Sequence, residues 1–151
     1  MSKILILAII LPSIIFLLLY SILFTDMALK QSYLDMYVNE LAQTIKLTNK
    51  IESSHIDQFR LRVYRVQSDS FDINDEELFF IKYGNSLDDL SNNYSIGNEL
   101  DAGTYVVIYI TADKPTMFSN LSNLTTWLVS SNQNRSIKLN SRAIVRVEGV
   151  L

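Results

Sequence analysis

Hydrophobic residues are concentrated near the start of the chain. The segment from Ile4 to Phe24 has 21 residues, and only Pro12, Ser13 and Ser21 among them are not apolar. A helix rises about 1.5 Å per residue, so this segment would span about 31 Å, close to the hydrocarbon thickness of about 30 Å. The pattern predicts a membrane-spanning helix over residues 1–25. Its membrane or filament-core positions include Ile4, Leu11, Pro12, Leu18 and Phe24.

Two other structures for this segment fit less well. A cleaved signal peptide has an apolar region of about 7–15 residues and a small-x-small cleavage site, whereas this segment is longer and residues 25–28 offer no such site. A buried core helix with no polar face would be unusual in a small protein. Lys3 precedes the segment, and Asp26 and Asp35 flank Lys30 after it. The positive-inside rule therefore favours a single-pass protein with a cytoplasmic N-terminus and an extracytoplasmic C-terminal domain.

The next segment, residues 26–54, is predicted to extend this helix with an amphipathic one. Residues 26–51 contain neither Gly nor Pro. A 4-3-4-3 spacing places five residues on one helical stripe: Leu34, Val38, Leu41, Ile45 and Thr48. This stripe either packs on the protein's own sheet or contacts another copy of the chain.

The remaining residues, 55–151, are predicted to form a β-rich extracytoplasmic domain. Four strands are expected, at 61–66, 77–83, 104–111 and 136–148, with a loop at 85–103. Both faces of 104–111 are apolar, which is typical of a central strand. Leucines and Met117 recur at helical spacing over 117–128, so a short helix is expected there. The fold class is therefore α+β: a long N-terminal helix followed by a small antiparallel sheet with one short helix.

Composition excludes several classes of function. Apolar residues make up 48 % of the 151 residues, which excludes disorder throughout. The net charge of −3 argues against a nucleic-acid partner. The chain has no cysteine and one histidine, His55, so thiol nucleophiles, Cys-based metal sites and sites with two imidazoles are excluded. Phosphate-binding and nucleophile-elbow motifs are absent from its sequence. We expect neither an enzyme nor a cofactor.

One acidic segment, residues 69–77, is a weak candidate for binding a metal ion. Asp72, Asn74 and Glu76 alternate and offer oxygen ligands, so they are a candidate calcium site. The segment lacks the glycine and the distal glutamate of a calcium-binding loop. A solvated acidic loop is the alternative, and a metal-dependent hydrolase using this segment is a third hypothesis for function.

Charge is also divided along the chain. Residues 68–101 carry Lys82 against nine acidic residues, a net charge of −8, whereas residues 102–151 have a net charge of +3. The acidic part is either solvated or meets the basic strands of a neighbouring subunit, for which the candidate residues are Arg60, Arg62, Arg142 and Arg146. Complementary charge of this kind mainly sets register and partner choice.

The order of these features resembles the TadE-like pseudopilins of tight-adherence pilus systems. The similar parts are the apolar helix with an internal proline (Leu11-Pro12-Ser13-Ile14) and, later, the strand Val106–Ile110, a proline at 115 and the terminal Ser141–Glu148. The chain differs from pilin-like proteins in having no acidic residue before Asp26 and no processing site before Ile4. Residues 55–103 have no counterpart in this resemblance.

The resemblance implies a minor pilin or pseudopilin-like structural subunit of a surface filament, secretion or conjugation apparatus. Its expected partners are membrane lipid, other copies of itself, companion pilins and an assembly platform. The subunit-contact candidates are Leu34, Val38, Leu41, Ile45, Phe118, Trp127, Arg142 and Arg146, with Tyr105 and Tyr109 as further candidates. The alternative is a single-span protein whose extracellular domain binds a ligand or partner as a monomer.

Overall fold

The computed structural model describes residues 2–67, 79–93, 96–97, 99–112 and 139–148. The elements follow the order α1 (Ser2–Thr48), α2 (Ser53–Gln67), β1 (Phe79–Gly84), β2 (Asn92–Asn93), β3 (Tyr105–Ala112) and β4 (Leu139–Arg146). The chain divides into two compact units, and the boundary falls within α1 between Leu29 and Lys30. This element order confirms the predicted α+β class, with a long N-terminal helix before a small antiparallel sheet.

Helix α1 continues without interruption through Pro12 and ends at Thr48. The next residue, Asn49, has a φ of 53°, in the left-handed region, and its N–H still donates to the Ile45 carbonyl at 2.9 Å. Asparagine tolerates this conformation better than most residues, so Asn49 ends the helix as a C-terminal cap. The amphipathic helix is therefore shorter than the predicted range of 26–54.

The sheet in the second unit has the strand order β2-β1-β3-β4, and all neighbours are antiparallel. Strand β3 pairs with β1 on one side and with β4 on the other, which confirms the prediction that it is central. Along β4, buried and exposed residues alternate from Leu139 to Arg146. This confirms that Ala143 and Val145 face one way while Ile144 and Arg146 face the other.

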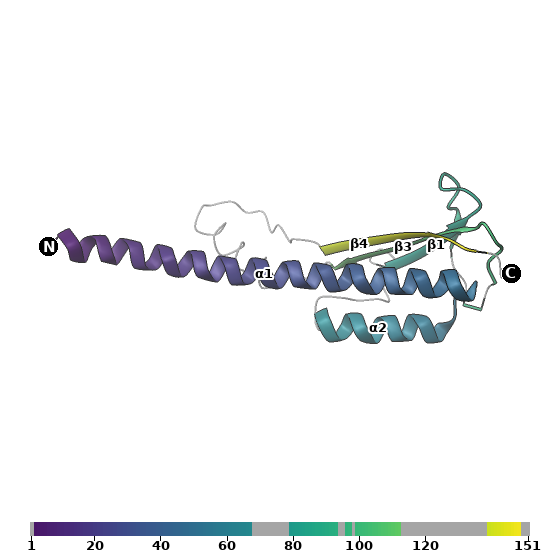
Figure 1. Cartoon of the computed structure of the whole chain (residues 1–151), viewed down its shortest axis with the longest axis horizontal. Coiled ribbons are helices and arrows are strands. Elements are labelled where there is room, and N and C mark those ends of the chain that lie inside the picture. Colours follow the sequence, from purple (N-terminus) through teal and green to yellow (C-terminus); the bar gives the residue numbers. More distant parts are fainter. Residues whose placement is uncertain (1, 68–78, 94–95, 98, 113–138, 149–151) are drawn as a thin grey trace. The chain divides into compact units, whose positions relative to one another are not determined.

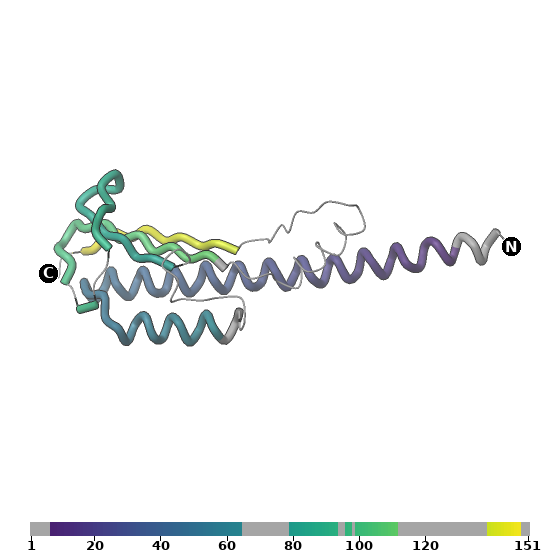
Figure 2. The backbone as a smooth tube through the Cα atoms, turned by 180° about the vertical axis from the view of Figure 1, so that it is seen from behind, coloured from purple at the N-terminus to yellow at the C-terminus, as the bar shows by residue number. Residues whose placement is uncertain are grey.

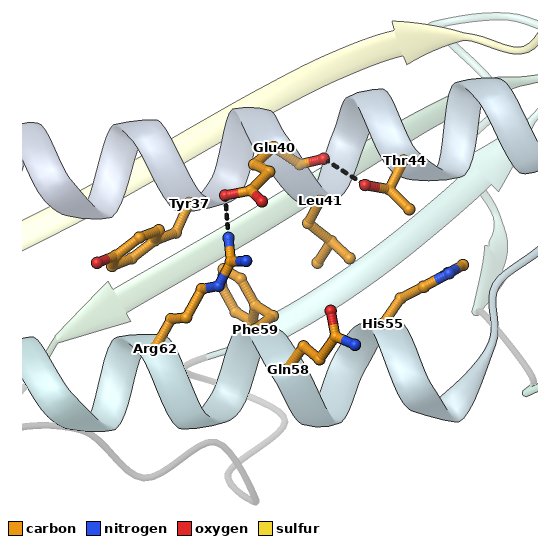
Figure 3. Close-up of a pocket in the computed structure, with 8 residues that line it drawn as sticks. All are labelled: Tyr37, Glu40, Leu41, Thr44, His55, Gln58, Phe59 and Arg62. Carbon is orange, nitrogen blue, oxygen red and sulfur yellow. Dashed lines mark hydrogen bonds and ion pairs between the residues drawn. The ribbon is translucent and has the colours of Figure 1, made fainter.

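Both helices of the second unit lie on one face of this sheet. Helix α2 runs beside the C-terminal part of α1 (Figures 1 and 2), and the strands pass behind both helices in Figure 3. The Phe59 ring of α2 stacks on Phe79 of β1, with centroids 5.4 Å apart. Helix α1 approaches β4, because the Gln31 side-chain amide donates to the Asn140 carbonyl at 2.7 Å. The hydrophobic core lies between this face and the two helices.

The predicted strand at 61–66 is wrong, because these residues lie in α2. The six residues Leu-Arg-Val-Tyr-Arg-Val alternate in a way that suits a strand, but a window this short fits either period. The helical pattern becomes visible only when the segment is extended towards the N-terminus. The buried side chains are then Ile56, Phe59 and Val63, at spacings of three and four, whereas Leu61 is 60 % exposed.

Other parts of the predicted domain are placed differently or lie outside the described residues. Strand β1 confirms the strand expected near 77–83, and β2 is a two-residue strand within the expected loop. The short helix expected over 117–128 lies outside the described residues, as do residues 136–138 of the last predicted strand.

The end of α1 is held by the loop that precedes β3. The Leu100 N–H donates to the Asn49 carbonyl at 2.8 Å, and Gly97 donates to the Ile51 carbonyl at 2.9 Å. Beside these bonds, the Lys50 ammonium lies 2.6 Å from the Glu99 carboxylate. This hydrogen bond and the charge of each partner raise the pKa of Lys50 and lower the pKa of Glu99.

Packing on the sheet predicts a strong contrast between two neighbouring positions of α1. Ile45 is completely buried and Leu47 is 77 % exposed. We expect Ile45→Ala to lower the free energy of unfolding of the domain by about 2–5 kcal/mol, because it leaves a cavity in the core. Leu47→Ala, the control, should change it little. Urea unfolding of the detergent-solubilised full chain, followed by circular dichroism, measures both. Equal effects would contradict this packing of α1.

The Lys50–Glu99 pair predicts a small pH-dependent contribution to stability. Since the pKa of Glu99 is lowered in the folded chain, its contribution is present at neutral pH and is lost as the pH falls through that lowered pKa. Since the pKa of Lys50 is raised, its contribution is lost as the pH rises through that raised pKa. Glu99→Gln should therefore be less stable than the native chain at pH 7, and the difference should shrink as the pH falls below the ordinary glutamate pKa of about 4.3. A difference that persists unchanged in acid would contradict this assignment.

Candidate interaction surfaces

The first candidate surface is the apolar part of α1. Every side chain from Leu7 to Phe24 is exposed except that of Leu23, which is half-buried. Of the predicted core residues, Leu11, Leu18 and Phe24 are 56 %, 60 % and 55 % exposed. This helix is long and apolar enough to cross a membrane. Contiguous apolar surface of this extent is rare on soluble monomers and marks a surface covered by lipid or by another protein.

Two hydroxyl groups in and beside this segment are satisfied within the helix. The Ser13 hydroxyl donates to the Ile9 carbonyl at 2.9 Å, and the Thr25 hydroxyl donates to the Ser21 carbonyl at 2.8 Å. Such bonds remove the need for water at these side chains. They allow the helix to lie in hydrocarbon or among other apolar helices, where an unsatisfied polar group costs several kcal/mol.

The amphipathic stripe of α1 belongs to the protein's own core. Leu34, Val38, Leu41 and Ile45 are at most 4 % exposed, whereas Thr48 is exposed. Of the two alternatives for this stripe, the structure therefore favours packing within the chain. The first four side chains are already covered, so they are not available for contact with a second copy.

A small cavity lies between α1 and α2 (Figure 3). Its volume is about 40 Å³, and it is lined by Tyr37, Glu40, Leu41, Thr44, His55, Gln58, Phe59 and Arg62. Ligand pockets usually measure about 300–1,000 Å³, so this cavity has room for water only. An ion pair between Arg62 and Glu40 closes one side of it. The cavity is a packing feature of the helix pair.

The outer face of the sheet, opposite the helices, carries aromatic rings and cations. The register aligns Phe80, Tyr109 and Arg142 in one row, Lys82, Val107 and Ile144 in the next, and Gly84, Tyr105 and Arg146 in the third. The Phe80 and Tyr109 rings stack with centroids 4.9 Å apart. Tyr109 also accepts a hydrogen bond of 2.7 Å from the Thr111 hydroxyl.

Two cations of this face lie over aromatic rings. The Lys82 ammonium lies 5.3 Å from the Phe80 ring centroid, and the Arg146 guanidinium lies 5.7 Å from the Tyr105 centroid. Within the part of the chain that the structure describes, neither of these cations nor Arg142 forms an ion pair with a carboxylate. Of these cations, Arg142 and Arg146 are exposed on the outer face.

Beside this face, β4 forms one edge of the sheet. An open groove of about 620 Å³ runs along its C-terminal half, lined by Gln43, Lys46, Ala102, Gly103 and residues 144–148. At its end, the Lys46 ammonium lies 2.7 Å from the Glu148 carboxylate. The groove thus places the strand edge, apolar side chains and a basic residue next to one another.

The predicted basic residues are divided between two places. Arg142 and Arg146 lie exposed on β4, as the charge hypothesis requires. Arg60 and Arg62 lie on α2 and not on a strand, so that part of the hypothesis is wrong. Both are also close to acidic residues of the same chain, Arg60 to Asp57 at 3.8 Å and Arg62 to Glu40.

The other predicted site residues lie outside the described residues. These are the calcium candidates Asp72, Asn74 and Glu76 and the contact candidates Phe118 and Trp127. Among the residues that are described, no group of three or more histidine or acidic side chains could hold a metal ion. The groove could not be predicted from sequence patterns, because it depends on how β4 packs beside α1.

Comparison with known proteins adds no family or activity. No protein-family model, curated protein or solved structure matches the chain.

Proposed function

We propose that the protein is a membrane-anchored, pilin-like structural subunit of a surface filament, secretion or conjugation apparatus. The observation that carries this proposal is the exposed apolar surface of α1 between Leu7 and Phe24. Lipid covers such a surface while the chain is in the membrane. Neighbouring apolar helices would cover it equally well in a filament core, because neither environment supplies water.

The connection between anchor and domain also supports a structural role. A single helix, α1, runs from the apolar segment into the domain, where Leu34, Val38 and Ile45 are buried. A domain attached in this way cannot separate from its anchor without losing core contacts. A subunit that leaves the membrane for a filament would therefore carry its domain with it.

The Lys3 side of α1 faces the cytoplasm in this proposal, and residues 26–151 lie outside. The bias in basic residues supports this orientation. The resemblance to TadE-like pseudopilins supports companion pilins and an assembly platform as partners. The groove beside β4 favours a second function, in which the anchored domain binds a partner as a monomer.

The structural proposal predicts that charge within the apolar segment prevents both anchoring and assembly. Each lysine at the centre of a spanning helix costs about 2.5–3.5 kcal/mol, so Leu11→Lys with Leu18→Lys should release the chain from membranes washed with alkaline carbonate. Leu47→Lys, at an exposed position of the domain, should leave the chain in the membrane fraction.

Filament formation separates the two functions. Electron microscopy of material sheared from cells should show ordered filaments that contain the native chain and the Leu47→Lys variant. An amine-reactive crosslinker should join native chains into multimers. If the native chain stays in the membrane, yields only monomers on crosslinking and is missing from sheared material, the structural subunit is excluded and the monomeric binding protein is favoured.

A further inference from the structure

We propose that the outer face of the sheet binds the same face of a second copy of the chain. In this contact, the turn that follows β1 in each copy lies on the exposed residues of β4 in the other. The inference rests on the proposed function and deepens it, because it supplies a contact between subunits. It combines an acidic turn, a basic row of side chains, and the places that the sheet gives to both.

The acidic turn consists of residues 86–89 and is held by its own backbone N–H groups. The Asp89 N–H donates to the Ser86 carbonyl at 3.2 Å, and the Asp88 N–H donates to the Ser86 hydroxyl at 3.1 Å. These bonds leave both aspartate side chains exposed. Leu87 beside them is 51 % exposed. The turn therefore presents negative charge together with an apolar side chain.

The acidic turn stands on the outer side of the sheet. Side chains alternate along a strand, so Gly84 shares the outer side of β1 with Phe80 and Lys82. A Cβ at Gly84 would collide with the Asp89 carbonyl oxygen, so the turn folds over this side of the glycine. The segment after β1 accordingly rises from the sheet on the side away from the helices (Figures 1 and 2).

The basic row consists of Arg142, Ile144 and Arg146 of β4, which lie on the same outer face. Both arginines are exposed, and Ile144 between them is 45 % exposed. Among the residues that the structure describes, no ion pair involves either arginine, Asp88 or Asp89. The turn and the row therefore match in charge and in apolar surface. A simple polyanion would match the arginines alone, whereas a second copy also brings Leu87 to Ile144.

The sheet places the turn and the row so that two copies can exchange them. Gly84, Tyr105 and Arg146 are aligned in one row of the register, and β3 separates β1 from β4. The turn and the basic row are thus two strand spacings apart, about 10 Å. A two-fold axis along the strands above β3 places β1 of one copy over β4 of the other. The acidic turn of each copy then lies over Arg146 and beside Ile144 of its partner, and the contact is made twice.

The same axis suits two copies that are inserted in one membrane. Strand β4 runs along the domain part of α1, because Gln31 donates to the Asn140 carbonyl near one end and Lys46 pairs with Glu148 beyond the other. An axis along the strands therefore also runs along this part of α1. It leaves the domain parts of α1 in the two copies pointing in the same direction.

Thiol crosslinking in membranes tests this contact, and the chain has no cysteine of its own to interfere. Two differently tagged full-length copies are co-expressed, one with Leu87→Cys and one with Ile144→Cys, and are treated with a short bismaleimide. The control replaces Ile144→Cys with Leu61→Cys, which is 60 % exposed on α2, on the other side of the sheet. We expect a product that carries both tags only in the first pair. No such product, or equal yields at the two positions, would overturn the inference.

Charge reversal tests the pairing of the turn with the row. Arg142→Glu with Arg146→Glu in both copies should lower the yield of the 87–144 product about tenfold, because like charges then face one another. Asp88→Lys with Asp89→Lys in both copies should do the same. The reversed turn in the Leu87→Cys copy and the reversed row in the Ile144→Cys copy should together restore the yield, because both contacts of the pair then join opposite charges. Restoration also shows that both variants fold, and its absence would overturn the inference.

The failure of this inference can be told from failure of the proposed function. If an amine-reactive crosslinker joins native chains into multimers while the 87–144 product does not form, the contact between outer faces is wrong and the structural subunit stands. If the 87–144 product forms but the chain is missing from sheared material, the contact stands and the filament subunit is wrong. If neither product forms, both are wrong.

Discussion

The structure depends on covering the apolar surface of α1. From Leu7 to Phe24 every side chain except the half-buried Leu23 is exposed, and the Ser13 hydroxyl is satisfied by the helix backbone. Water is a poor solvent for such a surface, at about 25 cal/mol for each Å² exposed. In the proposed function, a lipid bilayer or a set of similar helices covers this surface. Membrane anchoring and assembly are two ways of meeting the same requirement.

The same helix has a different environment after Lys30. Its buried stripe, including Leu34 and Ile45, packs in the core of the domain, and Gln31 and Lys46 contact β4 or the residues that follow it. At its end, Asn49 and Lys50 are held by the loop that precedes β3. One helix thus joins a segment suited to an apolar environment to a domain suited to water. On the outer face of the sheet, Arg142 and Arg146 of β4 are exposed.

The sequence allowed the prediction of elements whose pattern is local. The alternation along β4 and the double-sided apolar pattern of β3 identified both strands, and the stripe from Leu34 to Ile45 identified the buried face of α1. Helix α2 was mistaken for a strand because its central six residues fit both periods. The groove and the outer-face rows could not be predicted, because they depend on strand order and on the cross-strand register of Phe80, Tyr109 and Arg142.

Thiol accessibility in intact cells tests the covering of α1 most directly. Single variants Leu18→Cys and Leu47→Cys place thiols at positions that are 60 % and 77 % exposed in the isolated chain. If lipid or neighbouring helices cover the apolar segment, a water-soluble, membrane-impermeant maleimide will label Leu47→Cys and leave Leu18→Cys unlabelled until the chain is denatured. Equal labelling of the two variants in intact cells would mean that water reaches the apolar segment, and would contradict the account.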